Sequence, residues 1–112
     1  MELPNASQAR VEVEKVTGYL LSVSHPDGRT KAEFFARFGF QLQVWQILAE
    51  ALLKYGASNQ VTGVVESPYG TRYGVDGELE TPDGRNPLIR TVWIIDAGRS
   101  APRLITAYPI GS

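Results

Sequence analysis

The segment from His25 to Lys31 carries the residues best suited to chemistry. His25 is the only histidine of the chain, and histidine is the side chain that ordinarily exchanges protons near neutral pH. Arg29 and Lys31 follow it at the predicted start of a helix, where backbone N–H groups favour an anion. We therefore predict a phosphate-binding corner with His25 as general acid or base. The alternative is a solvated basic turn in which His25 only hydrogen-bonds the neighbouring backbone.

Arg90 is the charged residue of an otherwise apolar run in the C-terminal half. An unpaired charge is costly to bury, so its guanidinium must have a partner. That partner is either a carboxylate of the adjacent strand, Asp76 or Glu78, or the phosphate of a substrate in a ribonuclease-like site. The sequence leaves both open.

Thr106 and Tyr108 present hydroxyls on the same side of the last predicted strand. They could bind phosphate and orient a ribose, or pair with cross-strand neighbours. The two tryptophans, Trp45 and Trp93, fall in periodic apolar runs and are predicted to lie in the core.

The composition narrows the remaining chemistry. The chain has no cysteine, which excludes disulfides, thiolate metal sites and a cysteine nucleophile. It has no glycine-rich phosphate loop and no nucleophile elbow, and Asp76 with Glu78 is a weak signal for Mg²⁺, so we predict no metal and no cofactor. Eleven Lys and Arg nearly balance 12 Asp and Glu. Any attraction to nucleic acid must therefore come from a local cluster.

The elements that position these residues are read from the hydrophobic periodicity. The pattern predicts one α+β domain over residues 1–112, with about three N-terminal helices packed on one face of a four-stranded antiparallel meander sheet. Thr30 and Glu33 fit a capping box, and Gly39 and Gly56 fit helix ends. The predicted helices cover 14–23, 30–38 and 41–55, and the predicted strands cover 60–67, 71–80, 88–96 and 103–110.

One face of such a sheet stays free of helices. Side-chain alternation places Arg72, Arg90, Thr106 and Tyr108 on that face. The same alternation puts the apolar residues Val92, Ile94 and Leu104 beside them.

Six segments spread over the chain resemble a bacterial family known as domain of unknown function 6883. They are Leu3-Pro4-Asn5, Tyr19-Leu20-Leu21, the segment from His25 to Lys31, Tyr69-Gly70-Thr71-Arg72-Tyr73, Thr91-Val92-Trp93 and the segment from Pro102 to Pro109.

A looser resemblance is more informative about function. Helices followed by a four-stranded sheet that ends in Thr106-Ala107-Tyr108-Pro109 are similar to the toxin ribonucleases that include barnase, certain colicins and the RelE-like toxins. This resemblance implies cleavage of RNA without metal, by attack of the ribose 2′-hydroxyl on the adjacent phosphate. It implies site residues at Thr106 and Tyr108, then His25 and Lys31, then Arg90.

The leading hypothesis is accordingly a metal-independent ribonuclease toxin. His25, Lys31, Arg90, Thr106 and Tyr108 would be catalytic, Arg29 and Arg72 would bind substrate, and the partners would be RNA and a small antitoxin protein. The alternatives are a non-catalytic protein-binding module of the antitoxin or immunity type, and a domain that self-associates as a homodimer through the open sheet face. No run of apolar residues approaches the length of a membrane span, so we expect a cytoplasmic protein with no membrane partner.

Overall fold

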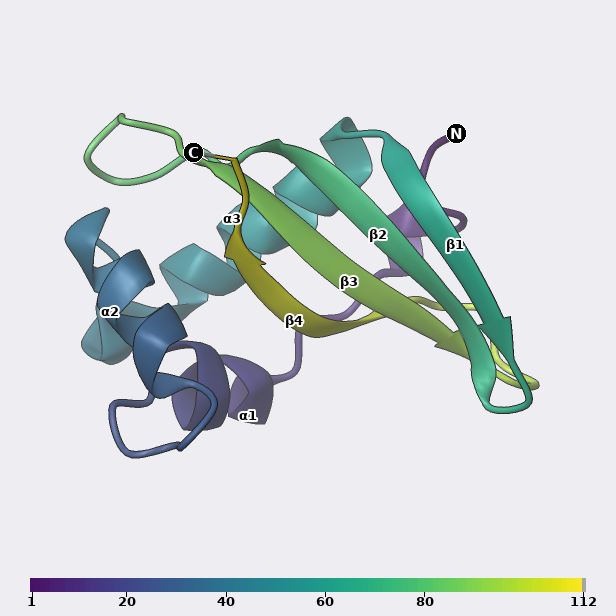
Figure 1. Cartoon of the computed structure of the whole chain (residues 1–112), viewed down its shortest axis with the longest axis horizontal. Coiled ribbons are helices and arrows are strands. Elements are labelled where there is room, and N and C mark those ends of the chain that lie inside the picture. The colour runs from purple at the N-terminus through teal and green to yellow at the C-terminus, as the bar shows by residue number, and fades with distance from the viewer. Residues whose placement is uncertain (112) are drawn as a thin grey trace.

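A computed structural model describes residues 1–111 of the chain (Figure 1). Helices occupy the N-terminal half and strands the C-terminal half, which confirms the predicted order of elements. The helical elements are η1 (Ala6–Gln8), α1 (Val13–Lys15), η2 (Val16–Leu20), α2 (Arg29–Arg37), η3 (Leu42–Val44) and α3 (Trp45–Ser58).

The four strands form one antiparallel sheet in the order β1-β2-β3-β4, so each strand pairs with its neighbour in sequence. This is the predicted meander, and β1 and β4 are its edges. Short connections favour this arrangement because they can join only antiparallel neighbours. The strands are β1 (Val61–Ser67), β2 (Gly70–Glu78), β3 (Leu88–Asp96) and β4 (Arg103–Pro109).

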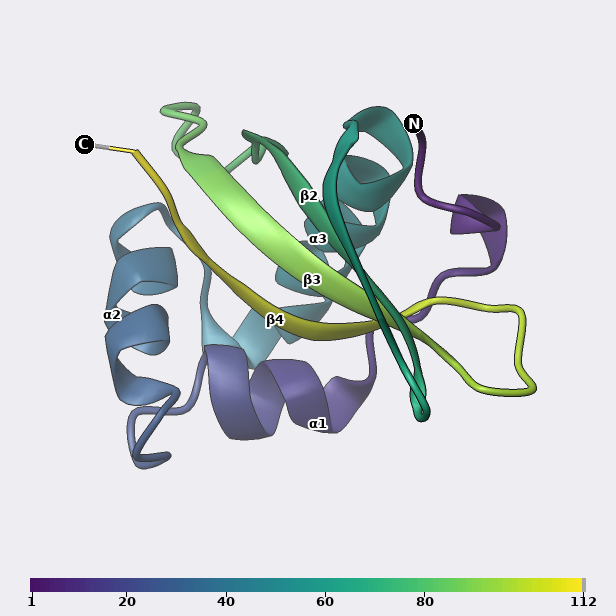
Figure 2. The same cartoon turned by 45° about the vertical axis from the view of Figure 1, so that its right-hand side comes forward.

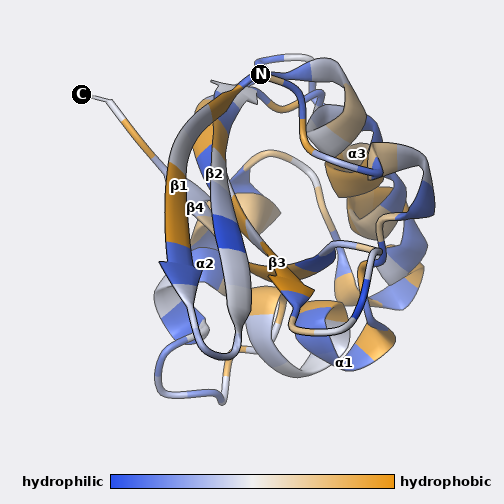
Figure 3. Ribbon diagram, turned by 90° about the vertical axis from the view of Figure 1, so that its right-hand side faces the viewer, coloured by the Kyte–Doolittle hydropathy of each residue, from blue (hydrophilic) through white to orange (hydrophobic). Residues whose placement is uncertain are grey.

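The helices lie on one side of the sheet and leave the other side open (Figures 2 and 3). Helix α3 contacts β2, whereas α1 and α2 contact the edge strand β4. Trp93 is fully buried between these layers, and Trp45 is partly buried against the same core. None of the helices within residues 1–111 has the length and apolar character that a membrane span requires.

A buried polar network ties α3 to the sheet. The Tyr55 hydroxyl lies 2.6 Å from the carbonyl oxygen of Val75 and 2.7 Å from that of Ile89. The indole N–H of Trp93 donates to the Thr91 hydroxyl at 2.7 Å. Burial raises the pKa of Tyr55 above its ordinary value, so this hydroxyl keeps its proton and acts as a donor.

Two predicted helix signals are wrong. Helix α2 begins at Arg29 with Gly28 as its N-cap and no side-chain cap, so Thr30 is not the cap of a capping box. Glu33 instead lies 3.6 Å from Arg29 as an ion pair. Gly56 does not end α3, which continues to Ser58. The residue is glycine because the close approach of Trp93 leaves no room for a side chain at that position.

An irregularity in the β3–β4 pairing corrects the predicted face of Leu104. Thr106 pairs with Val92 and Leu104 with Trp93, so one strand contains an extra residue at this point. A β-bulge of this kind reverses the alternation on its far side. Leu104 is therefore turned into the core and is 2% exposed, and Ile94 is also buried at 4%. Of the three apolar residues expected on the open face, only Val92 remains accessible.

Candidate functional site

Tyr19 lies in a turn of π-helix that follows α1. The N–H of Leu21 donates to the carbonyl of Val16, which is the five-residue spacing of a π-turn. Such turns are uncommon and occur frequently at functional sites, because they widen the helix and redirect a side chain. Lys15 precedes Tyr19 by one helical turn, so both side chains leave the same face.

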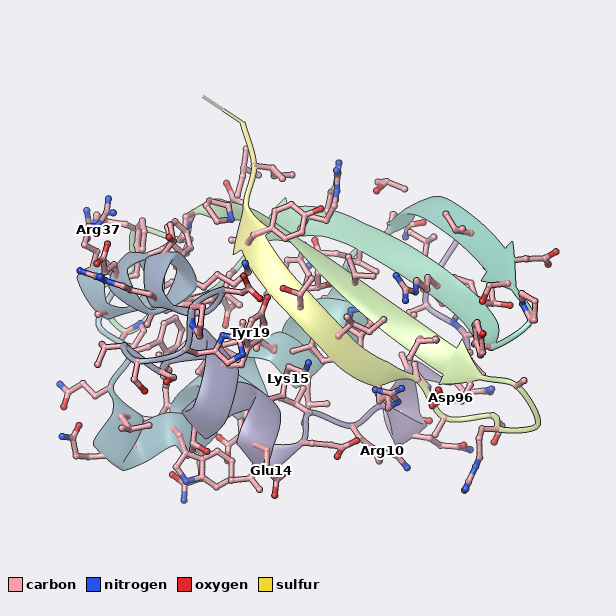
Figure 4. The ribbon with its side chains drawn as sticks, turned by 60° about the horizontal axis from the view of Figure 1, so that its bottom comes forward. Arg10, Glu14, Lys15, Tyr19, Arg37 and Asp96 are labelled. Carbon is pink, nitrogen blue, oxygen red and sulfur yellow. The ribbon has the colours of Figure 1, made fainter. Side chains whose placement is uncertain are left out.

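The Tyr19 side chain, labelled with Lys15 in Figure 4, contacts residues of α1, the His25 turn, α2 and β4. Its hydroxyl shares a 3.0 Å hydrogen bond with the Thr106 hydroxyl of β4. Its ring meets the His25 ring edge-on at a centroid separation of 5.1 Å. The ammonium groups of Lys15 and Lys31 lie 5.0 and 5.3 Å from the ring centroid. We call Lys15, Tyr19, His25, Lys31 and Thr106 the Tyr19 cluster.

The turn that presents His25 is built by its own ring. The Nδ1 atom accepts hydrogen bonds from the backbone N–H groups of Asp27, at 3.0 Å, and Gly28, at 3.1 Å. These two donors assign the lone pair to Nδ1 and the proton of the neutral ring to Nε2. His25 can therefore donate a hydrogen bond through Nε2, while Nδ1 is occupied by its backbone contacts.

Gly28 lets this turn lie directly against the π-turn. A Cβ atom at Gly28 would stand 2.2 Å from the carbonyl oxygen of Tyr19, which no side chain can occupy. The sequence Pro26-Asp27-Gly28 thus makes the turn and also brings His25 to Tyr19.

A cleft of about 480 Å³ opens beside the cluster, between α1 and β4. Lys15 and Arg103 give it positive charge, and Glu12, Glu14 and Asp27 give it negative charge. Its walls therefore offer both proton acceptors and cationic groups, and it is not a uniformly basic channel.

Arg90 lies outside the Tyr19 cluster, on the open face of the sheet. Its guanidinium makes a two-pronged salt bridge with Asp76, at 2.7 and 2.8 Å. Hydrogen bonds from Arg90 hold the pKa of Asp76 below its ordinary value, and the same bonds raise that of Arg90. Tyr108 is the cross-strand neighbour of Arg90. Of the alternatives open for Arg90, the structure shows the salt bridge to Asp76.

The remaining predicted positions are separate from the cluster. Arg29 is exposed and pairs with Glu33 on its own helix. Arg72 is exposed on the open face, where it borders a second cavity with Arg90. The structure thus brings together His25, Lys31 and Thr106, and places Arg72, Arg90 and Tyr108 on the neighbouring sheet surface.

Sequence reasoning missed Lys15 and Tyr19. Tyr19 was named only within the predicted helix 14–23 and in a segment that resembles a family, and Lys15 was not considered. A signal was present, since the spacing of four residues puts a cation beside an aromatic ring on any helix. Nothing local indicated that Thr106, 87 residues later, would meet them.

Side chains suited to metal binding do not gather in the structure. Within residues 1–111, no three His, Cys, Asp or Glu residues come together in a way that could hold an ion.

The fold recurs in a solved structure. A chain of the "Contact-dependent growth inhibition toxin - immunity protein complex from Klebsiella pneumoniae 342" superposes with a TM-score of 0.74. The alignment covers 96% of this chain and 97% of that one, at 16% sequence identity, so the likeness concerns the fold alone. A search of curated proteins found no match.

The sequence also matches a family, described as "Domain of unknown function (DUF6883)", over residues 2–111. Because this match spans nearly the whole chain, the protein belongs to the DUF6883 family.

Proposed function

We propose that the chain is a metal-independent RNA-cleaving domain whose site is the Tyr19 cluster. One observation carries the proposal. Two ammonium groups, an imidazole and the hydroxyl of Thr106 surround the Tyr19 side chain beside an open cleft. Cations and hydroxyls in this arrangement are suited to bind a phosphodiester and to stabilise the charge that develops on it.

The proposed reaction is an internal transesterification. The ribose 2′-oxygen bonds to the adjacent phosphorus while the bond from phosphorus to the 5′-oxygen breaks, which yields a 2′,3′-cyclic phosphate and a 5′-hydroxyl. The 2′-hydroxyl proton passes to a carboxylate of the cleft, for which Glu12, Glu14 and Asp27 are the candidates. Lys15 or Lys31 stabilises the pentavalent phosphorus and returns a proton to the 5′-oxygen.

The other cluster members position the substrate. The hydroxyls of Tyr19 and Thr106 hydrogen-bond the ribose and a phosphate oxygen, and His25 donates through Nε2. Arg90 and Tyr108, next to Thr106 on the sheet, contribute charge and a hydroxyl at the edge of the site. Arg29 and Arg72 contact more distant phosphates of the same strand.

A toxin role, neutralised by a small antitoxin protein in the cytoplasm, accords with this chemistry. The similar solved chain belongs to a complex of a growth-inhibition toxin with its immunity protein. An antitoxin that covers the cleft or the open sheet face would block RNA.

The test is RNA cleavage by the purified chain in EDTA, together with growth of bacteria that express it without a partner. We expect cleavage and growth arrest. Tyr19→Phe keeps the ring contacts and removes the bond to Thr106, and it should slow cleavage at least about tenfold. Thr106→Val should have a similar effect. The double variant should be impaired by less than the product of the two single effects, because each single change already removes the shared Tyr19–Thr106 hydrogen bond.

Tyr69→Phe is the matched control, because Tyr69 is 81% exposed at the tip of the β1–β2 turn and lies outside the cluster. Wild-type protein that leaves RNA intact, or a Tyr69→Phe variant as impaired as Tyr19→Phe, would contradict the proposal.

A second candidate is the non-catalytic protein-binding module. The observation that favours it is the exposure of single apolar side chains on two strands of the sheet, Val65 of β1 at 64% and Leu88 of β3 at 51%. In that case Arg90→Ala or Tyr108→Ala would abolish complex formation with a partner protein, and no preparation would hydrolyse RNA.

A further inference from the structure

A second cavity, of about 300 Å³, lies on the open sheet face away from the helices. Its floor is formed by Gly63 of β1 and Gly74 of β2, which pair with each other across the two strands, and by Val92 of β3. Val65 and the two arginines Arg72 and Arg90 line its sides. We call this cavity the glycine groove.

Neither space nor a positive φ angle requires glycine at the two floor positions, although Gly63 adjoins an irregularity in the β1–β2 pairing. Neither residue has a positive φ angle. A Cβ atom at Gly63 would meet nothing within 4 Å, and one at Gly74 would come no closer than 3.9 Å to the backbone of Gly63. A glycine in the middle of a strand is destabilising relative to alanine. Two such residues side by side therefore lower stability, and what they provide is a bare backbone floor.

The groove lies in line with the Tyr19 cluster. Gly63, Gly74, Val92 and Thr106 follow one another across the four strands as cross-strand partners. Neighbouring strands are about 4.8 Å apart, so two spacings place Gly74 about 10 Å from Thr106. A nucleic acid strand held at the Tyr19–Thr106 hydroxyl pair and crossing the sheet would reach the groove with a neighbouring nucleotide.

The walls of the groove match the two parts of a nucleotide. Its flat backbone floor and the side chains of Val65 and Val92 suit the face of a base. Arg72 is exposed and has no ion-pair partner among residues 1–111, so its guanidinium is available to a phosphate or to stack on the base. Arg90 lies at the opposite end, where its salt bridge with Asp76 holds the guanidinium in place.

From this geometry we infer that the glycine groove is a binding subsite for a nucleotide of single-stranded RNA beyond the two that the cleaved phosphate joins. The inference rests on the proposed function for the identity of the ligand. It adds the residues that hold the strand outside the reacting position.

The test measures binding separately from cleavage. The probe is a mixed-sequence 2′-O-methyl decaribonucleotide, which cannot be cleaved because it lacks the attacking hydroxyl. We expect it to shift the backbone amide signals of Gly63 and Gly74 in NMR spectra of the whole chain. Gly74→Val fills the groove at a position with open space and good strand propensity, and it should weaken binding at least about tenfold without loss of folding.

Two further measurements sharpen the result. Arg72→Gln should reduce the slope of log K against log salt by about 0.7, the value for one phosphate contact in a single strand. The cleavage rate of a dinucleoside phosphate by wild-type protein tests the reacting position alone, because its two nucleosides do not extend beyond the cleaved phosphate.

Unshifted glycine amides at saturation, or a Gly74→Val variant that binds the decanucleotide as tightly as wild type, would overturn the inference even if RNA is cleaved. Amide shifts induced by a partner protein and not by the decanucleotide would also overturn it, in favour of a protein-docking groove. The proposed function fails separately, if the dinucleoside phosphate and longer RNA both remain intact with wild-type protein.

Discussion

Replacement of His25 separates its role in holding a turn from a role in proton transfer. His25→Ala removes the acceptor of two hydrogen bonds, which the backbone N–H groups of Asp27 and Gly28 donate to Nδ1. At about 0.5–1.5 kcal/mol for each hydrogen bond, the loss of stability is about 1–3 kcal/mol. His25→Asn keeps an acceptor, because an asparagine oxygen caps a turn by bonding backbone N–H groups two residues on. We expect it to recover about 1 kcal/mol relative to alanine.

The assay is the RNA cleavage rate of both variants, compared at a temperature where urea denaturation shows each to be folded. Loss of general acid–base catalysis costs about 10²–10⁴ in rate. Because the Nδ1 contacts occupy the basic nitrogen of the neutral ring, we expect His25→Asn to stay within about tenfold of wild type. If asparagine restores the stability but slows cleavage by about 10²-fold or more, His25 transfers a proton and the assignment made from its hydrogen bonds is wrong.

Three further predictions concern the elements that support the site. Thr91→Val should lower the free energy of unfolding by about 1–3 kcal/mol, because the buried indole N–H of Trp93 loses its acceptor; Thr91→Ser, which keeps the hydroxyl, should lose less in urea denaturation. Gly56→Ala should lower the thermal midpoint although alanine is the better helix former, since its Cβ would stand 2.8 Å from the Trp93 ring; a raised midpoint would contradict this packing. The Asp76 pKa lies below its unfolded value because of Arg90, so the stability that this pair adds is present at neutral pH and is lost as pH falls through the folded pKa; the stability difference between wild type and Asp76→Asn should shrink below about pH 4.

The fold was largely predictable because it follows from periodicity and turns. Four runs of alternating residues separated by glycine and proline turns leave little choice but a meander. The predicted face of Leu104 was wrong because a β-bulge depends on how two strands pair. The alternation of residues within one strand does not reveal it. The error at Gly56 is similar, since the approach of Trp93 to helix α3 is a tertiary contact.

The candidate site was predictable only in part. His25 and Lys31 stood out by residue type, and Thr106 by its place on the last strand. Tyr19 was missed for two reasons. Its position depends on the π-turn, which the spacing of residues does not predict, and its partner Thr106 lies far along the chain in β4. The alternation of side chains correctly predicted that Arg90 lies on the open face of the sheet, and Asp76 was among its candidate partners. The sequence could not distinguish a salt bridge with Asp76 from a contact with the phosphate of a substrate.

The Tyr19–Thr106 hydrogen bond also sets when the site can exist. It joins residues 87 positions apart, and a contact this distant forms only after the intervening chain is in place. A chain still being synthesised would already contain Lys15, Tyr19, His25 and Lys31. It would lack the Thr106 hydroxyl as a partner for Tyr19 until β4 joins the sheet. Under the proposed function, a chain shortened before β4 would lack the Thr106 hydroxyl and should not cleave RNA.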